Sequence, residues 1–322
     1  MANPMMVVEN LTKHFPVAGG FLGTQTIGQI RAVDGVSFAI GEGQTLALVG
    51  ESGCGKTTTA RLVLRLWRPT AGSVTLDSRD IHSLEGRDIA WFRTSVQAVF
   101  QDPWASLSPR MRIRDIVAEP LVVNRHLPHD EVRDRVAATL KKVGMEPWHG
   151  DLFPHEFSGG QRQRIALASA LITEPRLIVL DEPVSALDVS VRAQVINLLK
   201  DIQNELGTSY LLISHDLETV RYVADRIAVM YMGQIVESGT SEQVFAEPRH
   251  PYTRALFDSI LPAHPRNRGK GPTIQGEVQS VLDPPSGCRF RMRCPIAADV
   301  CLGTPPPREF ATGHVAACHF AI

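Results

Sequence analysis

The sequence predicts an α/β fold with a mixed, largely parallel sheet at its core. Three short segments, residues 46–49, 177–180 and 210–214, are apolar almost throughout, which is typical of strands buried on both faces. Helical patterns at residues 189–206 and 217–224 lie on either side of the third segment. Because parallel strands are joined by such helical connections, we expect these segments to form one sheet covered by helices.

Further regions are expected around that core. Residues 6–38 alternate apolar and polar positions around a glycine-rich interruption, which indicates an antiparallel β subdomain. The region at about 102–175 is mostly helical in pattern, so we expect a helical subdomain there. A linker rich in Pro and Gly, residues 261–272, then precedes a small Cys-rich C-terminal tail. We therefore divide the chain into a main domain, residues 1–248, and an extension, residues 249–322.

Charge and hydropathy disfavour several classes of protein. The 322 residues include 33 Lys and Arg against 34 Asp and Glu, a net charge of -1. Without a basic excess no electrostatic field gathers nucleic acid, so no nucleic-acid partner is expected. No run approaches the roughly 18 apolar residues of a membrane-spanning helix, and residues 1–15 lack the layout of a secretory signal. We expect the chain to stay in the cytosol.

A glycine-rich segment, GESGCGKT at residues 50–57, follows the first apolar run and matches the phosphate-loop pattern GxxxxGK[ST]. Its glycines let backbone N–H groups and the next helix N-terminus face a nucleotide's phosphates. Lys56 is expected to reach the β- and γ-phosphates, and the Thr57 hydroxyl to bind Mg²⁺. Cys54 is expected to fill a small-residue position rather than act as a nucleophile. The residues assigned to nucleotide binding here are Gly50, Ser52, Gly53, Gly55, Lys56, Thr57 and Thr58.

Two carboxylates, Asp181 and Glu182, end the second apolar run. This position is the carboxyl edge of a parallel sheet, where ligands bind in open α/β folds. Asp181 is expected to hold Mg²⁺, which leaves Glu182 to orient and polarise the attacking water. An acidic strand end without a function is commoner when taken alone. Together with a phosphate loop, the pair favours hydrolysis of a nucleotide.

A second anion site is expected where SGGQR, residues 158–162, opens a helix. Ser158 is a good N-cap, and the following glycines leave backbone N–H groups uncovered. One nucleotide does not need two such sites in one chain. Here the sequence resembles the ATP-binding subunits of ABC transporters, in which the signature loop of one subunit closes over the nucleotide held by the other. The resemblance implies a head-to-tail dimer and assigns Ser158, Gly160 and Gln161 to ATP binding.

The same resemblance implies roles for four more residues. Gln101 in VFQDPW is similar to the glutamine that contacts Mg²⁺ and the lytic water, and Asp188 in SALD to a residue of the dimer interface. His215 in ISHD resembles the switch histidine that contacts the γ-phosphate. Phe15 stands where the family places an aromatic ring against adenine, with a core aromatic on an edge strand as the alternative. The expected catalytic residues are Glu182, His215 and Gln101, and the expected Mg²⁺ ligands are Thr57, Gln101 and Asp181.

Longer segments, among them FQDPWASLSPRM, HPYTRAL and PPSGCRFRMRCP, resemble the second ATPase subunit of bacterial dipeptide and oligopeptide importers. The resemblance covers almost the whole chain. It implies a peripheral protein on the cytoplasmic face of the inner membrane, a homologous second ATPase in a heterodimer, two membrane permease subunits and, indirectly, a peptide-binding protein. Ser169 departs from the pattern, because these relatives usually carry an arginine there.

Four of the five cysteines lie close to the C-terminus: Cys288, Cys294, Cys301 and Cys318. In a reducing compartment such a group indicates a metal site before disulfides. Four thiolates can hold an iron–sulfur cluster or Zn²⁺. Because similar peptide-importer ATPases carry a four-cysteine iron–sulfur site, the resemblance favours a [4Fe-4S] cluster, with zinc and an unligated or disulfide-bonded tail as alternatives. Its expected role is to pin a tail that has little core of its own.

Two other functions compete with peptide import. A soluble ABC ATPase acting on ribosomes or DNA would usually fuse two ATPase units or insert long nucleic-acid-binding segments, whereas this chain has one copy of each motif and no basic excess. A redox-sensing regulatory module would instead use the cysteine tail to control its partner.

Overall fold

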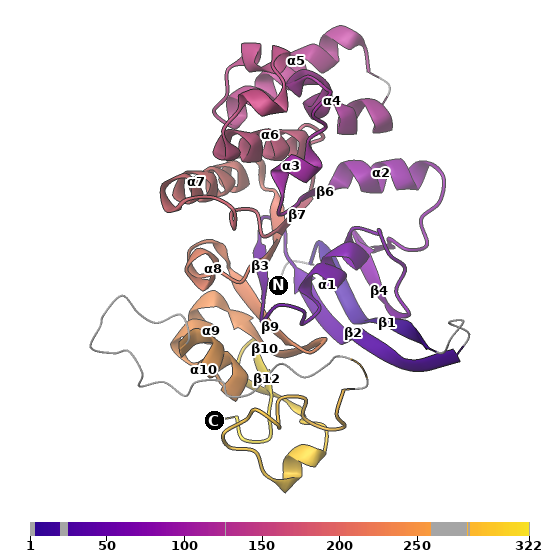
Figure 1. The fold of residues 1–322 in the computed structure, drawn as a ribbon, viewed down its shortest axis with the longest axis vertical. Helices are drawn as coiled ribbons and strands as arrows, with labels where there is room; N and C mark the ends of the chain where they lie inside the picture. Colours follow the sequence, from indigo (N-terminus) through magenta and orange to yellow (C-terminus); the bar gives the residue numbers. More distant parts are fainter. Residues whose placement is uncertain (1–3, 20–24, 126, 259–281, 283, 322) are drawn as a thin grey trace. The chain divides into compact units, whose positions relative to one another are not determined.

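The computed structural model describes residues 4–19, 25–125, 127–258, 282 and 284–321, and the linker expected at residues 261–272 lies outside them (Figure 1). The chain forms two compact units. The helical unit comprises Met1–Met5, Ile40–Thr45 and Leu76–Ile213, and the phosphate-loop unit comprises Met6–Ala39, Leu46–Thr75 and Ser214–Ile322. Each unit is described by itself.

The helical unit contains a parallel three-stranded array. Its strands are β6 (Val96–Val99), β7 (Leu177–Asp181) and β8 (Ser209–Ile213), with β7 in the middle. Val99 lies opposite Leu180, and Asp181 lies opposite Ile213. Because the apolar residues of β7 and β8 are buried on both faces, the structure confirms that these runs are parallel core strands.

The rest of this unit is mainly helical, as expected for a helical subdomain (Figure 1). The helix α6 (Gly159–Leu171) is central to the group, since it packs against α3, α4, α5 and α7. The helices of this unit also include α2 (Arg87–Ser95), α3 (Pro103–Ser106), α4 (Ile113–Asn124) and α5 (His129–Lys142), with the short 3-10 helices η1 (Pro147–Asp151) and η2 (Pro154–Glu156).

The helix α7 (Val189–Leu206) has local features that explain why its bounds could be predicted from the sequence. Asp188 caps its N-terminus, and Gly207 ends it in the left-handed conformation with φ 67°. Its buried side chains recur at helical spacing on one face: Val195, Ile196, Leu199 and Ile202. The helix therefore begins and ends where the sequence predicts.

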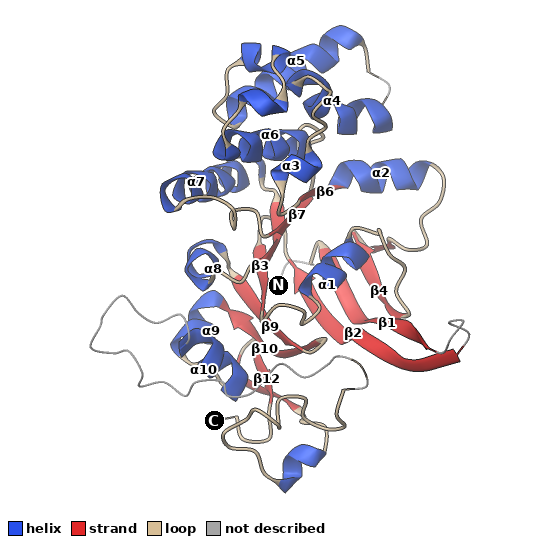
Figure 2. Ribbon diagram, in the orientation of Figure 1, coloured by secondary structure: helices blue, strands red, loops and turns tan. Residues whose placement is uncertain are grey.

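The phosphate-loop unit contains a mixed sheet, in which β3 (Thr45–Val49) pairs in parallel with β9 (Arg226–Tyr231). Antiparallel pairs continue it from β9 to β10 (Gln234–Thr240), from β10 to β12 (His314–Ala317) and from β12 to β11 (Pro307–Ala311). The helix α9 (Ser241–Ala246) packs against β9 and β10 (Figure 2). The C-terminal tail thus adds strands to this sheet, although the sequence analysis expected only a Cys-rich tail with little core of its own.

Further elements complete this unit. The long strands β1 (Met6–Gly19) and β2 (Gln25–Ile40) are neighbours in a second sheet, where β1 lies between β2 and β4 (Ala71–Leu76). The short strand β5 (Arg79–Asp80) falls in the helical unit. The remaining helices are α1 (Lys56–Val63), α8 (Leu217–Val223), α10 (Pro251–Asp258) and η4 (Asp299–Leu302). None of the described helices is long and apolar enough to cross a membrane.

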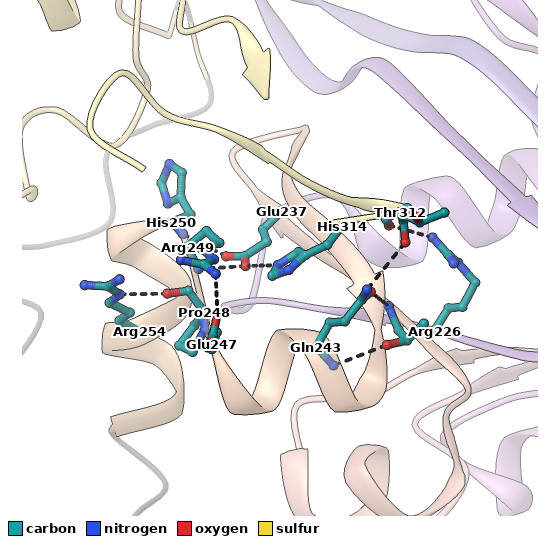
Figure 3. Close-up of polar contacts among 12 residues, drawn as sticks. Arg226, Glu237, Gln243, Glu247, Pro248, Arg249, His250, Arg254, Thr312 and His314 are labelled. Atoms are coloured by element: carbon teal, nitrogen blue, oxygen red, sulfur yellow. Dashed lines mark hydrogen bonds and ion pairs between the residues drawn. The ribbon is translucent and has the colours of Figure 1, made fainter. Parts of the chain in front are cut away.

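A buried carboxylate joins the extension to the sheet (Figure 3). Glu237 on β10 is 1% exposed and accepts the backbone N–H groups of Arg249 and His250, each at 2.8 Å. His314 on β12 places its Nε2 2.8 Å from the same carboxylate. Since a buried carboxylate is costly unless it is hydrogen-bonded, this arrangement ties two distant segments of the extension to one residue of β10.

Candidate functional site

The loop between β3 and α1 has the curled shape of an anion cradle. Gly53 and Gly55 have φ values of 78° and 111°, in the left-handed region that favours glycine. A Cβ on Gly55 would lie 2.1 Å from the carbonyl oxygen of Ala32, so no larger residue fits there. Lys56 is buried, and its Nζ donates to the carbonyls of Gly50 and Glu51 at 2.7 and 2.9 Å. Glycine backbone and a fixed cation at a helix N-terminus suit a phosphate group.

The other residues of the loop differ in exposure. Ser52 and Thr57 are exposed and Thr58 is half-buried, so two hydroxyls lie at the solvent side of the loop. Cys54 is buried, and this burial raises the pKa of its thiol, which is therefore protonated at neutral pH. A protonated, buried thiol packs as a small apolar group and is not a nucleophile.

The helical unit brings two of the expected catalytic residues together. Glu182 directly follows β7, and Gln101 lies two residues after the neighbouring parallel strand β6. The Gln101 Nε2 donates to Glu182 Oε2 at 2.9 Å. Glu182 has φ 50°, a left-handed conformation that is unusual outside glycine, and its N–H donates to the Ile213 carbonyl at 2.9 Å. Strained backbone of this kind is found at functional sites, and here it holds a carboxylate at the edge of the strands.

The signature segment forms a complete N-terminal cap. Ser158 is the N-cap of α6; its Oγ accepts the N–H of Gln161 at 3.4 Å, and Gln161 Oε1 accepts the N–H of Ser158 at 3.0 Å. This reciprocal pair is a capping box, which fixes where the helix starts. Gly160 lies inside the first turn. Ser169, later in α6, donates its hydroxyl to the Ile116 carbonyl of α4 at 3.2 Å.

Asp188 has a local structural role in the helical unit. It is the N-cap of α7, accepting the N–H of Val191 at 3.0 Å and the hydroxyl of Ser190 at 2.9 Å. The hydrogen bond from Val191, followed by that from Ser190, lowers the pKa of Asp188 below its ordinary value. The carboxylate is therefore charged at neutral pH.

Two further predicted residues lie in the phosphate-loop unit. His215 is exposed immediately before Asp216, the residue whose side chain caps α8. Phe15 on β1 makes an edge contact with Trp67, with ring centroids 5.2 Å apart. The alternative interpretation of Phe15 was a core aromatic on an edge strand, but β1 is an inner strand of its sheet.

The tail cysteines correct the prediction of a metal centre. All four are described, and within the described part of the chain no group of three or more His, Cys, Asp or Glu is arranged to hold a metal ion. Burial raises the pKa of Cys288 to about 11 and also raises the pKa of Cys294 and Cys318. Cys318 packs with Ala316, Ala321 and Phe310 as a small apolar residue. The predicted [4Fe-4S] cluster is wrong, and the zinc alternative and the redox-sensing interpretation lose their basis with it.

Three residues near the phosphate loop were not singled out from the sequence: Glu51, Tyr252 and Arg293. Arg293 and Tyr252 both contact Glu51, from positions more than 200 residues further along the chain. The one signal available was an acidic residue inside an anion-binding loop, which calls for a compensating cation.

Comparison with known proteins agrees with this architecture. The family described as "ABC transporter" matches residues 33–185, and the family described as "Oligopeptide/dipeptide transporter, C-terminal region" matches residues 236–301. Among solved structures, cbiO1 of Clostridium perfringens, part of the ABC transporter complex cbiONQ, has a TM-score of 0.65 at 32% identity, covering 76% of this chain and 91% of that one. The dimeric ATP-binding cassette MJ0796, bound to ADP and phosphate, has a TM-score of 0.64 at 28% identity, covering 74% and 99%.

Relatives of known sequence match over the full length. The dipeptide transport ATP-binding protein DppF of Escherichia coli K12 is 43% identical, covering 100% of this chain and 96% of that protein. The oligopeptide transport ATP-binding protein AppF of Bacillus subtilis 168 is 44% identical, covering 99% and 98%. Neither name mentions an iron–sulfur group. The fold and family expected from the motifs are confirmed, and the chain belongs to the ABC transporter ATPases.

Proposed function

We propose that this chain hydrolyses ATP to power the import of dipeptides or oligopeptides through a membrane permease. The observation that carries the ATPase chemistry is the hydrogen bond from Gln101 to Glu182 at the ends of adjacent parallel strands. Peptides as the cargo are supported by the match of residues 236–301 to the C-terminal region of oligopeptide and dipeptide transporters.

In this function the phosphate-loop unit binds the nucleotide. Backbone N–H groups of the loop and the Lys56 ammonium neutralise phosphate charge, which is where most of the catalysis of phosphoryl transfer comes from. Lys56 already lies at the centre of the loop through its bonds to Gly50 and Glu51, so little side-chain ordering is left for binding. Phe15, beside Trp67, supplies an aromatic surface for the base.

The helical unit supplies the hydrolytic carboxylate. Glu182 orients the attacking water and accepts its proton, and the Gln101 amide holds the Glu182 carboxylate in one orientation. His215, exposed after its strand, is assigned to the γ-phosphate. Ser158, Gly160, Gln161 and Asp188 are assigned to the nucleotide of a partner ATPase in a head-to-tail pair.

The expected Mg²⁺ ligands offer the oxygen donors that this ion prefers. Thr57 supplies a hydroxyl, Gln101 an amide oxygen and Asp181 a carboxylate, and hydroxyl, carbonyl and carboxylate oxygens are hard ligands. Thr57 and Gln101 are exposed, so their oxygens are accessible. When bound, Mg²⁺ would neutralise charge on the β- and γ-phosphates.

The partners follow from the same proposal. The transporter would contain this chain, a homologous second ATPase, two permease subunits at the inner membrane and a peptide-binding protein that delivers cargo. In this assembly the chain would be one half of an ATPase heterodimer, bound peripherally at the cytoplasmic face of the membrane. Alone, the chain is expected to hydrolyse ATP poorly.

The test is Glu182→Gln in the assembled transporter, with ATP turnover and uptake of a labelled dipeptide into vesicles as readouts. The substitution keeps the size of the side chain and its bond to Gln101 but removes the base. Turnover and uptake are expected to fall by about 10²- to 10⁴-fold, while ATP affinity stays within about twofold.

The matched control is Glu205→Gln, an exposed carboxylate at the end of α7, which is expected to leave turnover unchanged. A Glu182→Gln protein that keeps more than about a tenth of wild-type turnover contradicts the assignment of the base. ATP-driven turnover without any peptide uptake contradicts the cargo.

A further inference from the structure

The C-terminal extension reaches back to the phosphate loop within the phosphate-loop unit. Arg293 Nη1 and Nη2 donate to the two carboxylate oxygens of Glu51, at 2.7 and 2.9 Å. Only 6% of the Arg293 side chain and 23% of the Glu51 side chain are exposed. A two-pronged pair of this kind fixes the orientation of the carboxylate as well as its position.

Glu51 is also held through its backbone. Its N–H donates to Tyr252 Oη at 2.8 Å, and its carbonyl accepts from Lys56 Nζ at 2.9 Å. Tyr252 is fully buried and contacts the rings of Tyr231 and Phe290, at centroid distances of 4.6 and 5.5 Å. Since Tyr252 and Arg293 belong to the extension, the extension contacts Glu51 at its backbone N–H and at both carboxylate oxygens.

A second connection runs through the backbone beside the loop. The buried Arg289 donates to the carbonyl of Met232 and to the carboxylate of Asp34. The next residue after Met232, Gly233, donates its N–H to the Cys54 carbonyl of the phosphate loop at 2.8 Å and accepts the N–H of Asp34 at 2.8 Å. Arg293 therefore contacts the loop directly at Glu51, and Arg289 holds the backbone next to Gly233, which contacts the loop at Cys54.

Charge gives the Glu51 contact a consequence for binding. A carboxylate in the phosphate loop repels the triphosphate that the loop is proposed to bind, unless a cation compensates it. The hydrogen bonds that Arg293 donates to Glu51 raise the pKa of Arg293 above its ordinary value, so the arginine is charged at every accessible pH.

We propose that Arg293 is a positioning residue for the nucleotide: it fixes Glu51 so that the phosphate loop is already shaped for the phosphates, and it cancels the charge of the loop's own carboxylate. The proposal rests on the phosphate-binding function proposed above. It assigns to the C-terminal extension a part in ATP binding.

The experiment titrates the full-length chain with a fluorescent ATP analogue and Mg²⁺. Arg293→Ala is expected to weaken binding about tenfold, because the loop loses a brace and keeps an uncompensated carboxylate. Adding Glu51→Gln to Arg293→Ala is expected to restore most of the affinity. The control is Arg291→Ala, whose guanidinium donates to the Ser286 carbonyl of its own segment, and it is expected to bind within about twofold of wild type.

The assembled transporter gives a second readout. Arg293→Ala is expected to raise the KM for ATP while kcat stays close to wild type, because the residue acts on binding and not on the water. Arg293→Lys keeps the positive charge but loses one of the two parallel hydrogen bonds to the Glu51 carboxylate, so an intermediate affinity for ATP is expected. Glu51→Gln alone is expected to bind ATP as tightly as wild type or more tightly. If Arg293→Ala does not fold, the proposal is tested with this variant instead.

Three results overturn the proposal: wild-type affinity in Arg293→Ala, a loss that Glu51→Gln does not reduce, or weaker binding in Glu51→Gln alone. Failure of the underlying function is distinguished by Lys56→Ala, because normal ATP binding in that variant rejects the phosphate loop itself.

Discussion

The phosphate loop and the C-terminal extension lie in the same compact unit but acquire their conformations differently. The backbone turns of the loop are set by its own residues: Gly53 and Gly55 are left-handed, and Lys56 bonds carbonyls five and six residues away. The extension is held by partners far away in sequence, since Arg293 and Glu51 are 242 positions apart. The turns of the loop therefore depend on nearby residues, whereas the contacts of the extension with Glu51 join distant parts of the chain.

The largest expected effect tests the local half of this comparison. Gly55→Ala should lower the free energy of unfolding by about 4 kcal/mol, because alanine is strained at positive φ and its Cβ would also collide with the Ala32 carbonyl. The matched variant is Gly53→Ala, whose Cβ would meet nothing within 4 Å and which should cost only about 1–2 kcal/mol. Chemical denaturation measures both, and equal losses would contradict the role of the Ala32 contact.

The same contrast explains what the sequence could predict. Strands β3, β7 and β8, the helix α7 and the phosphate loop are specified by patterns of neighbouring residues, so their positions could be read directly. Gln101 and Glu182 were both assigned to the site, Gln101 through the family resemblance and Glu182 from its place after an apolar run. Their hydrogen bond depends on β6 and β7 being adjacent, which the spacing along the chain does not reveal.

The extension was the region where sequence reasoning failed. Cysteine spacing suggested metal ligands, but spacing does not show how the side chains are arranged, and among the described residues no such group is arranged to hold a metal ion. The contact of Arg293 with Glu51 has no local pattern at all. A tail thought to lack a core proved to share the sheet of the phosphate-loop unit through β12.

A smaller effect tests the distant contacts of the extension. Glu237→Gln should lower the free energy of unfolding by about 3 kcal/mol, because an amide satisfies the donors of Arg249, His250 and His314 less well than a buried carboxylate. The control is Glu242→Gln, exposed on α9, with an expected change below about 0.5 kcal/mol. Limited proteolysis should release the C-terminal segment first. Unchanged stability in Glu237→Gln would mean that the extension does not depend on this carboxylate.

The smallest expected effect is a pH dependence of the free energy of unfolding, which arises from His250 in the extension. His250 is 1% exposed, and burial lowers its pKa to about 3 from 6.5, in keeping with its Nδ1 accepting the N–H of Tyr252 at 3.0 Å. Below pH 6.5 the unfolded chain binds a proton that the folded chain does not, so stability falls as the pH drops toward 3. Between pH 7 and pH 5 this residue should account for a loss of about 2 kcal/mol.

Replacing His250 with Asn removes the titrating group and keeps an acceptor near the Nδ1 position. Whatever its stability at pH 7, this variant should lose about 2 kcal/mol less than wild type between pH 7 and pH 5, as measured by chemical denaturation at each pH. His129→Asn, at an exposed site on α5, is the matched control and should follow the wild-type profile. If His250→Asn and wild type weaken in parallel, then burial does not hold this histidine neutral, and its contact with Tyr252 adds no acid sensitivity to the extension.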